Sequence, residues 1–299
     1  MKVLLSCLIK LENHYLEEWL THYKNLHIDK IVIYDNNDSS GPLAEHIEDL
    51  PIVNEMKESN FIDIVKVPDE TCVQMRCYNE CYLKYSKEYD WFLFLDIDEY
   101  LMLDKKYNND IHLFLSESMF SKFDMIHLNW KIYDDNDIIY TNNDYRIKER
   151  FTRPLFESKH SKCYDREIKS IVRGHLSNVM FTKNAHTIRN RSLNCCNAIG
   201  EQANSLSQRS NKVIHTNAWI NHYICKSLEE YCTNKLKRLG GSTPHKTGLR
   251  YNESFFWQYN IKTKDKIDAY RKFTEDAISN NVVTVPRRII PSIKVKSIL

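Results

Sequence analysis

The sequence of 299 residues predicts an α/β fold in which a mainly parallel sheet is flanked by helices. Continuous apolar runs of strand length recur over the first third of the chain, and stretches with apolar residues at helical spacing lie between them. Clusters of polar residues follow directly where several of these runs stop. In parallel α/β sheets, ligands bind beyond the carboxyl ends of the strands, so a functional site is expected there.

The first strand is predicted in the run KVLLSCLI (2–9), which is apolar enough for a strand buried on both faces. Asn13 follows as an N-cap for a helix with a single apolar stripe. A second buried strand covers 31–34 and ends in a polar turn that Gly41 and Pro42 close. The stripe of the helix is formed by Leu16, Trp19, Leu20, Tyr23 and Leu26.

The next elements repeat the alternation. FIDIVKV (61–67) is predicted to be a third strand, 71–89 a helix, and 91–95 a fourth strand that ends at an acidic cluster. This order of elements indicates an α/β layer with a mainly parallel sheet. The polar clusters at the predicted strand ends are 10–13, 35–40 and 96–99.

Beyond residue 101 the pattern is less regular. The helix at 227–239 has the clearest signal, because Ser227 and Glu230 form an S-x-x-E capping box at its start. We also expect strands at 125–133, 169–176 and 178–182, a polar surface loop at 194–211, and helices at 253–260 and 264–280.

Composition excludes several classes of protein. The net charge of +2 indicates neither a nucleic-acid binder nor an acidic tail. The nine cysteines include no C-x-x-C pair, which is typical of reduced thiols in a cytosolic protein. The N-terminal apolar run soon meets charged residues and is interpreted as a strand, and no apolar stretch reaches the roughly 20 residues of a membrane helix. We therefore expect a cytoplasmic location.

The stretch FLFLDIDEYL (92–101) places Asp96, Asp98 and Glu99 directly after a buried strand. A D-x-D element at a strand end suits a hard divalent cation such as Mn²⁺ or Mg²⁺, which a diphosphate would share. A phosphatase with an aspartate nucleophile does not fit, since Tyr100 stands where that motif needs Thr or Val. A calcium loop of the EF-hand type does not fit either, because this stretch lacks the glycine and the final glutamate that such a loop requires.

Longer stretches resemble a known family. The segments KLENHYLEEWLTHYKNLHIDKIVIYDNNDSS and QMRCYNECYLKYSKEYDWFLFLDIDEYL, with NWKIYDDND, KERFTRP, KSIVRGHL and INHYICKSLEEYCTNKLKRLGG, are similar to bacterial glycosyltransferases of the GT-A fold, in the family-2-like and family-92-like group. The resemblance spans about residues 3–241. It implies a GT-A domain over 1–241, with a donor half (1–101) and an acceptor half (102–241), followed by a helical C-terminal extension over 242–299.

The resemblance implies a nucleotide-diphospho-sugar donor, with UDP-sugar as the expected form, and a Mn²⁺ or Mg²⁺ cofactor. Asp96, Asp98 and a histidine, for which His222 is the candidate, would hold the metal. Several of these residues could instead have an ordinary structural role. Gln74 and Tyr78 could simply line one face of a helix, and Lys226 could belong to the solvated start of a helix. The implied donor-binding residues are Lys10, Glu12, Asn13, Asp35, Asn36, Gln74, Tyr78 and Lys226.

The acceptor half leaves more alternatives open. An inverting transferase needs a carboxylate base, for which Glu149 and Asp165 are the candidates, and inversion is expected because the resembling families generally invert. Trp130 and Tyr133 could stack on an acceptor sugar or belong to the core. The acids of the DDND run, Asp134, Asp135 and Asp137, suit either a solvated loop or a second metal site.

We therefore expect a metal-dependent glycosyltransferase of lipopolysaccharide or capsule biosynthesis, acting on a glycan or a lipid-linked oligosaccharide. The alternatives are a sugar nucleotidyltransferase, whose Gly-rich N-terminal loop is absent, and a non-catalytic glycan-binding or scaffolding protein of transferase ancestry. The tail either contacts anionic lipid at the inner face of the cytoplasmic membrane or packs on the domain. Its basic and apolar residues are Arg287, Arg288, Lys294 and Lys296 with Ile289, Ile290, Ile293 and Val295.

Overall fold

The fold is described from a computed structural model, which covers residues 1–40, 45–68, 70–142, 146–155, 164–177, 179–236 and 253–279. The expected turn at Gly41 and Pro42 and the expected basic tail lie outside these ranges. Within them, nine strands form one sheet in the order β3-β2-β1-β4-β7-β6-β9-β5, with β8 paired to β6. The strands are β1 (Val3–Ile9), β2 (Lys30–Asp35), β3 (Ile62–Lys66), β4 (Trp91–Phe94), β5 (Glu99–Leu103), β6 (Met125–Ile132), β7 (Ile168–Arg173), β8 (Cys195–Asn197) and β9 (Ala218–His222).

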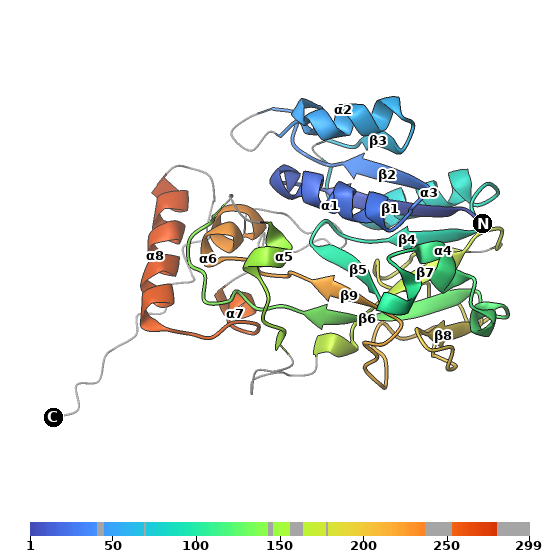
Figure 1. Cartoon of the computed structure of the whole chain (residues 1–299). Helices are drawn as coiled ribbons and strands as arrows, with labels where there is room; N and C mark the ends of the chain where they lie inside the picture. The colour runs from blue at the N-terminus through green and yellow to red at the C-terminus, as the bar shows by residue number, and fades with distance from the viewer. Residues whose placement is uncertain are drawn as a thin grey trace.

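The N-terminal half of the sheet is parallel, as predicted. Strands β3, β2, β1 and β4 pair in parallel and lie side by side in Figure 1. Strand β7 then enters antiparallel to both β4 and β6, and β5 pairs antiparallel with β9. The α/β fold class is confirmed, with a mixed sheet that is mainly parallel.

The helices cover both faces of the parallel strands. α1 and α2 pack with Leu5 and Ile33 on one face, while α3 packs with Leu4 and Val32 on the other. Burial on both faces explains the long apolar runs within β1, β2 and β4. The helices are α1 (Asn13–Asn25), α2 (Pro51–Glu58), α3 (Gln74–Tyr85), α4 (Ile111–Leu115), α5 (Ile147–Arg150), α6 (Leu228–Glu230), α7 (Glu253–Phe256) and α8 (Lys264–Ser279), with one-turn 3₁₀ segments at Ile47–Asp49, Lys105–Tyr107, Ser118–Phe120 and Tyr164–Arg166.

Two expectations for the acceptor half are wrong. Residues 179–182 form no strand, although they were expected to lie in one. The segment 194–211 is not simply a surface loop, because it begins with β8, whose Cys195 and Cys196 are fully buried beside β6. Polar composition concealed this strand, since its two buried thiols are too few to form an apolar run.

The predicted capping box at Ser227 is confirmed. The Ser227 hydroxyl accepts from the Glu230 N–H at 3.2 Å, and the Glu230 carboxylate accepts from the Ser227 N–H at 3.0 Å. A helix was expected over 227–239, but its α-helical part, α6, covers only Leu228–Glu230. After Glu230 the chain continues as one π-helical segment, Tyr231–Lys235, which brings Lys235 toward the sheet.

The C-terminal helix α8 contacts the acceptor half through charge. Lys266 is 2% exposed and pairs with Asp135 at 2.7 Å and Asp137 at 2.8 Å, while Arg153 pairs with Asp134 at 2.5 Å. Asp134 and Asp135 are therefore buried ion-pair partners, which rules out the solvated-loop alternative for both residues. Figure 1 shows α8 in orange at the end of the molecule that lies away from β8.

Across the part of the chain that the structure describes, none of the helices combines the length and the apolar character that a membrane crossing requires.

Candidate active site

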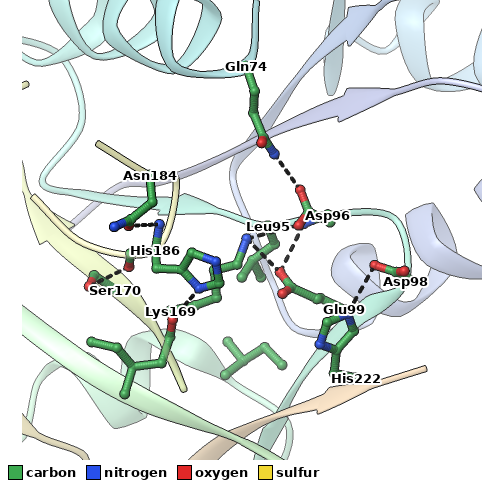
Figure 2. Close-up of polar contacts among 12 residues, drawn as sticks. Gln74, Leu95, Asp96, Asp98, Glu99, Lys169, Ser170, Asn184, His186 and His222 are labelled. Atoms are coloured by element: carbon green, nitrogen blue, oxygen red, sulfur yellow. Dashed lines mark hydrogen bonds and ion pairs between the residues drawn. The ribbon is translucent and has the colours of Figure 1, made fainter. Parts of the chain in front are cut away.

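The acidic cluster lies in the connection between β4 and β5. Asp96 and Asp98 occupy the turn after β4, and Glu99 is the first residue of β5. The turn places Asp96 at the carboxyl end of the parallel strands, close to the predicted polar residues that follow β1 and β2. Figure 2 shows that the three acids point into a group of polar side chains that come from four other segments.

Strand register places three of these side chains on the same face of the sheet. Glu99 is opposite His222, and His222 is opposite Ile132 of β6. Lys169 is opposite Leu128, which is four residues before Ile132 on the same strand. Because paired residues share a face and faces alternate along a strand, Glu99, His222 and Lys169 project together.

Asp96 is held on both of its oxygens by the chain. Oδ1 accepts a hydrogen bond from the Gln74 amide at 2.6 Å and a longer one from the Tyr78 hydroxyl at 3.4 Å. Oδ2 pairs with the Lys169 ammonium at 3.1 Å. Burial is the largest influence and opposes the charged form, but Lys169 and His222 together hold the pKa of Asp96 below its ordinary value.

Asp98 has a different set of partners. Its Oδ1 lies 3.5 Å from His222 Nε2, while its Oδ2 lies 3.1 Å from Lys235 and 3.8 Å from Lys226. Burial would raise the pKa of Asp98, but Lys235 and Lys226 hold it well below the usual range. Burial also lowers the pKa of His222, which favours the neutral imidazole that binds metals.

Glu99 is completely buried and joins the same network. Its Oε2 pairs with Lys169 at 3.0 Å and accepts the Asp96 backbone N–H at 3.0 Å. Its Oε1 is buried and has no hydrogen-bond partner within the described residues. Burial raises the pKa of Glu99 to about 8.

Lys226 is aimed at the cluster by an unusual backbone. Its ammonium is 5% exposed and lies 3.2 Å from Glu12, besides its contact with Asp98. Lys226 has φ of 60° and Leu11, next to Glu12, has φ of 55°, which are left-handed conformations that side chains disfavour. Such strained conformations persist only where the surrounding fold holds them, and they are concentrated at functional sites. The segments of Leu11 and Lys226 are therefore held in place by the fold.

The remaining predicted donor-binding residues also lie at the ends of β1 and β2. Lys10 pairs with Asp38 at 2.6 Å, and the Asn13 side chain accepts from Asn37 at 3.0 Å. Asn37 in turn donates to Asp35, through its backbone N–H at 3.1 Å and its amide at 2.8 Å. The structure thus brings together the polar residues that the sequence places after separate strands.

Asn36 has a structural role in the same region. Its amide donates to the carbonyl oxygens of Val67 at 2.6 Å and Glu70 at 3.0 Å. These bonds tie the end of β2 to the segment after β3. A contact between Asn36 and a nucleoside remains a prediction.

The two candidate bases have different surroundings. Glu149 is exposed and caps α5, since its carboxylate accepts the Arg146 N–H at 3.2 Å. Asp165 is buried, and its Oδ1 accepts the N–H of Ile132, the residue opposite His222, at 3.0 Å. Its Oδ2 has no hydrogen bond within the described residues and lies 4.0 Å from His215. Burial raises the pKa of Asp165.

Trp130 combines the two roles that the sequence left open. It is 8% exposed, as expected for a core residue. Its ring also contacts two imidazoles, with centroid distances of 4.3 Å to His222 and 5.0 Å to His186. Tyr133 stacks on Tyr223 at 5.0 Å. Trp130 therefore borders the acidic cluster from the core side.

Sequence reasoning missed two lysines of the site. Lys169 is 2% exposed in β7, where a charged residue among Ile168, Ile171 and Val172 is itself a signal, because a buried lysine requires a partner. Lys235 offered no comparable signal, since it reaches Asp98 only through the π-helical segment. Lys235 also donates to the carbonyl oxygen of Ile224.

The donors present fit a divalent cation in part. Asp98 Oδ1 and His222 Nε2 have the 3.5 Å separation expected of two ligands that each lie roughly 2.1 Å from one ion. Within the described residues, no group of three or more His, Cys, Asp or Glu side chains is arranged to hold a metal. A cation here would thus need ligands from a diphosphate or from water, as Mg²⁺ commonly does.

Three solved structures are similar to parts of this chain. S. aureus TarS (1-349) is 14% identical with a TM-score of 0.36, and the match covers 58% of this chain and 47% of that one. The longer TarS structure is 13% identical with a TM-score of 0.41, and the match covers 78% of this chain and 38% of that one. The mannosyltransferase PcManGT from Pyrobaculum calidifontis, in complex with GDP-Man and Mn²⁺, is 12% identical with a TM-score of 0.31. That match covers 42% of this chain and 35% of the mannosyltransferase. The chain spans less than half the length of each structure.

No curated protein matches the sequence. A family model does match it, over residues 4–283, which is nearly the whole chain and includes every segment of the acidic cluster. The model is described as glycosyltransferase family 92, in agreement with the resemblance carried by the D-x-D strand and its neighbours. The chain therefore belongs to glycosyltransferase family 92.

Proposed function

We propose that the protein transfers a sugar from a nucleotide-diphospho-sugar, with a UDP-sugar as the expected donor. The observation that carries this proposal is the union of Asp96 and Asp98 with Lys169, Lys226 and Lys235 at the carboxyl ends of the parallel strands. The donor would lie over this edge, where α/β folds bind nucleotides. Gln74 and Tyr78 reach the same point from α3, as expected for residues that line a donor site.

Asp98 and His222 are the residues that we assign to a bound Mn²⁺ or Mg²⁺. The sequence also predicts Asp96 as a ligand. When bound, the cation would neutralise charge on the diphosphate as the bond to the sugar breaks. Lys226 would stabilise the nucleoside diphosphate as it leaves, because its ammonium is already directed at Asp98.

Incubation with a panel of nucleotide sugars tests the proposal. One donor is expected to release its nucleoside diphosphate in the presence of Mn²⁺, and release should fall at least about a hundredfold when EDTA removes the metal. Readdition of Mn²⁺ should restore the rate, which separates metal removal from denaturation. If calorimetry detects no binding of any donor, the protein is better explained as a scaffold; full activity in EDTA would instead remove the metal from the proposal.

For the catalytic base we propose Asp165 ahead of Glu149. Asp165 is buried beside the strand that carries Trp130, and one of its oxygens accepts no hydrogen bond from the residues that the structure describes. Glu149 is instead occupied as an exposed helix cap. A buried carboxylate with a raised pKa suits proton abstraction from an acceptor hydroxyl. This role belongs to an inverting mechanism, in which the base and the leaving group lie on opposite sides of the sugar carbon.

Asp165→Asn is expected to lower kcat at least about a hundredfold, because asparagine keeps the bond to Ile132 but cannot accept the proton. Glu149→Gln should change kcat less than about threefold, since an amide can still cap a helix. Steady-state kinetics measure both values, and NMR of the product would show an inverted anomeric configuration. The opposite ranking of the two variants would transfer the role to Glu149.

The acceptor that we propose is a glycan or a lipid-linked oligosaccharide of a surface polysaccharide such as lipopolysaccharide or capsule. Support comes from the resemblance of the acceptor half and from Trp130, whose ring borders the cluster. Peripheral contact of the basic tail with the inner face of the cytoplasmic membrane belongs to the same proposal.

A further inference from the structure

His186 lies in the segment that follows β7, and none of the roles assigned above uses it. Its ring centroid is 5.0 Å from that of Trp130, at the border of the acidic cluster. Resting on the function proposed above, we propose that His186 is a specificity-determining residue for the transferred sugar. Its Nε2 accepts a hydrogen bond from one hydroxyl of that sugar.

The fold holds His186 through both its backbone and its ring. The backbone N–H donates to Asn184 Oδ1 at 2.9 Å, and the backbone carbonyl oxygen accepts from the Ser170 hydroxyl at 2.9 Å. Within the ring, Nδ1 lies 3.0 Å from the carbonyl oxygen of Ile168. The imidazole is therefore oriented before any ligand binds, as a residue that discriminates between sugars requires.

The bond to Ile168 decides what the other ring nitrogen can do. A carbonyl oxygen only accepts, so Nδ1 carries the proton and Nε2 keeps its lone pair. Desolvation lowers the pKa of His186 to about 3, and the charge of Lys169 acts in the same direction, so the ring is neutral at pH 7. Nε2 has no hydrogen-bond partner within the described residues, and the side chain is only partly buried, so a ligand can reach this acceptor.

His186 is held beside the centre of the candidate site. Ile168 and Ser170, which bond to it, are the two neighbours of Lys169 in β7, and Lys169 pairs with Asp96 at 3.1 Å. Figure 2 shows the His186 ring next to the Lys169 side chain, with the nitrogen that is not bonded to Ile168 on the side of Lys169 and Asp96. A group that contacts Nε2 would thus lie close to the acidic cluster.

The order of the strands indicates which part of the donor reaches His186. The predicted nucleoside contacts follow β1 and β2, the acids follow β4, and His186 is bonded to β7, which lies on the other side of β4 from β1. A donor with its nucleoside over β1 and its diphosphate near the acids would place its sugar toward β7. The diphosphate itself offers oxygens that accept and do not donate, so it does not suit an acceptor such as Nε2, whereas a sugar hydroxyl does.

Calorimetry with nucleotide sugars tests the proposal under one set of buffer conditions. The probes are UDP-glucose, UDP-galactose, UDP-N-acetylglucosamine and GDP-mannose, each compared with its free nucleoside diphosphate. The variants are His186→Phe, which keeps a ring against Trp130 but has no acceptor, and His186→Gln, whose amide oxygen can still accept. His112→Phe is the matched control, because the His112 ring also bonds to a backbone carbonyl, that of His27 at 2.8 Å, on α4.

His186→Phe is expected to bind the preferred nucleotide sugar at least about fivefold more weakly than the wild type, because one hydrogen bond is lost. Its affinity for the free nucleoside diphosphate should change less than about twofold, since that probe has no transferred sugar. His186→Gln and His112→Phe should both bind the nucleotide sugar within about twofold of the wild type.

Monodeoxy analogues of the preferred sugar identify the hydroxyl. One analogue should bind the wild type at least about fivefold more weakly than the intact nucleotide sugar does. His186→Phe should bind that analogue and the intact nucleotide sugar within about twofold of each other, because the contact is already absent. The other analogues should lose the same affinity in the variant as in the wild type.

Wild-type affinity for a folded His186→Phe, judged by circular dichroism, would overturn the role of His186, as would an equal loss for the free nucleoside diphosphate. The wild type alone also tests it, since undiminished binding of every monodeoxy analogue would exclude the hydroxyl contact. A variant that changes only the KM for the glycan acceptor would move the contact to the acceptor and overturn its assignment to the transferred sugar. A wild type that binds none of the probes would overturn the proposed function as well, whereas the other results leave that function standing.

Discussion

Asp98→Asn is expected to lower kcat/KM for sugar transfer at least about a thousandfold, the largest effect of any single substitution in the site. Asparagine has the shape of aspartate but not its charge. The substitution therefore weakens the proposed cation site with His222, 3.5 Å away, and removes the counter-charge of Lys226 and Lys235. Steady-state kinetics over a range of Mn²⁺ concentrations measure the loss.

Calorimetry provides a second measurement for the same variant, because Mn²⁺ binding should become undetectable when Asp98 loses its charge. The control is Asp268→Asn, the same chemical change at an exposed position on α8, which should leave kcat/KM within about twofold. A variant of Asp98 that keeps more than a tenth of the wild-type kcat/KM would refute the assignment of this carboxylate to the metal.

Arg150→Met is expected to lower the free energy of unfolding by about 3–5 kcal/mol. The Arg150 guanidinium donates two hydrogen bonds of 2.8 Å to Glu230, and the two side chains are 5% and 3% exposed. Tyr15 of α1 donates to the same carboxylate, so the pair joins α5, α6 and α1. Without Arg150 the charge on Glu230 is buried and unpaired, and its desolvation is no longer offset.

Urea unfolding followed by circular dichroism measures this change. Adding Glu230→Gln to Arg150→Met should recover most of the lost stability, because the unpaired charge disappears. Arg76→Met is the surface control, since Arg76 pairs with Glu70 and both side chains are about half exposed, and its cost should stay below about 1 kcal/mol. Equal costs for the two arginines would contradict the view that burial decides the value of these pairs.

The elements that could be predicted from the sequence are those whose signal is local. β1, β2 and β4 contain long apolar runs because both faces of these strands are covered, and the apolar stripe of α1 has helical spacing. The S-x-x-E box at Ser227 was equally readable, since capping involves residues three apart. β5 and β9 gave no such signal, because each of them includes residues of the site: Glu99 begins β5 and His222 ends β9.

In the candidate site, too, the residues with a local sequence signal could be predicted, while their pairing could not. Asp96 and Asp98 were identified because a D-x-D element interrupts an apolar stretch, and Glu12 and Lys226 came from the resemblance. Their pairing with each other, at 3.2 Å across more than two hundred residues of chain, could not be read from either segment. Left-handed conformations at Leu11 and Lys226 aim these segments, and neither residue type predicts such a backbone.

By itself the sequence determined the fold class, the edge of the sheet where the site lies, and the acids at its centre, because burial and strand ends leave a local pattern. Only the tertiary structure decided which charge neutralises which acid. Lys169, Lys226 and Lys235 come from a strand, a loop and a π-helical segment, and each finds its partner through folding. A buried charge needs a counter-charge, but the chain that supplies it can come from anywhere in the sequence.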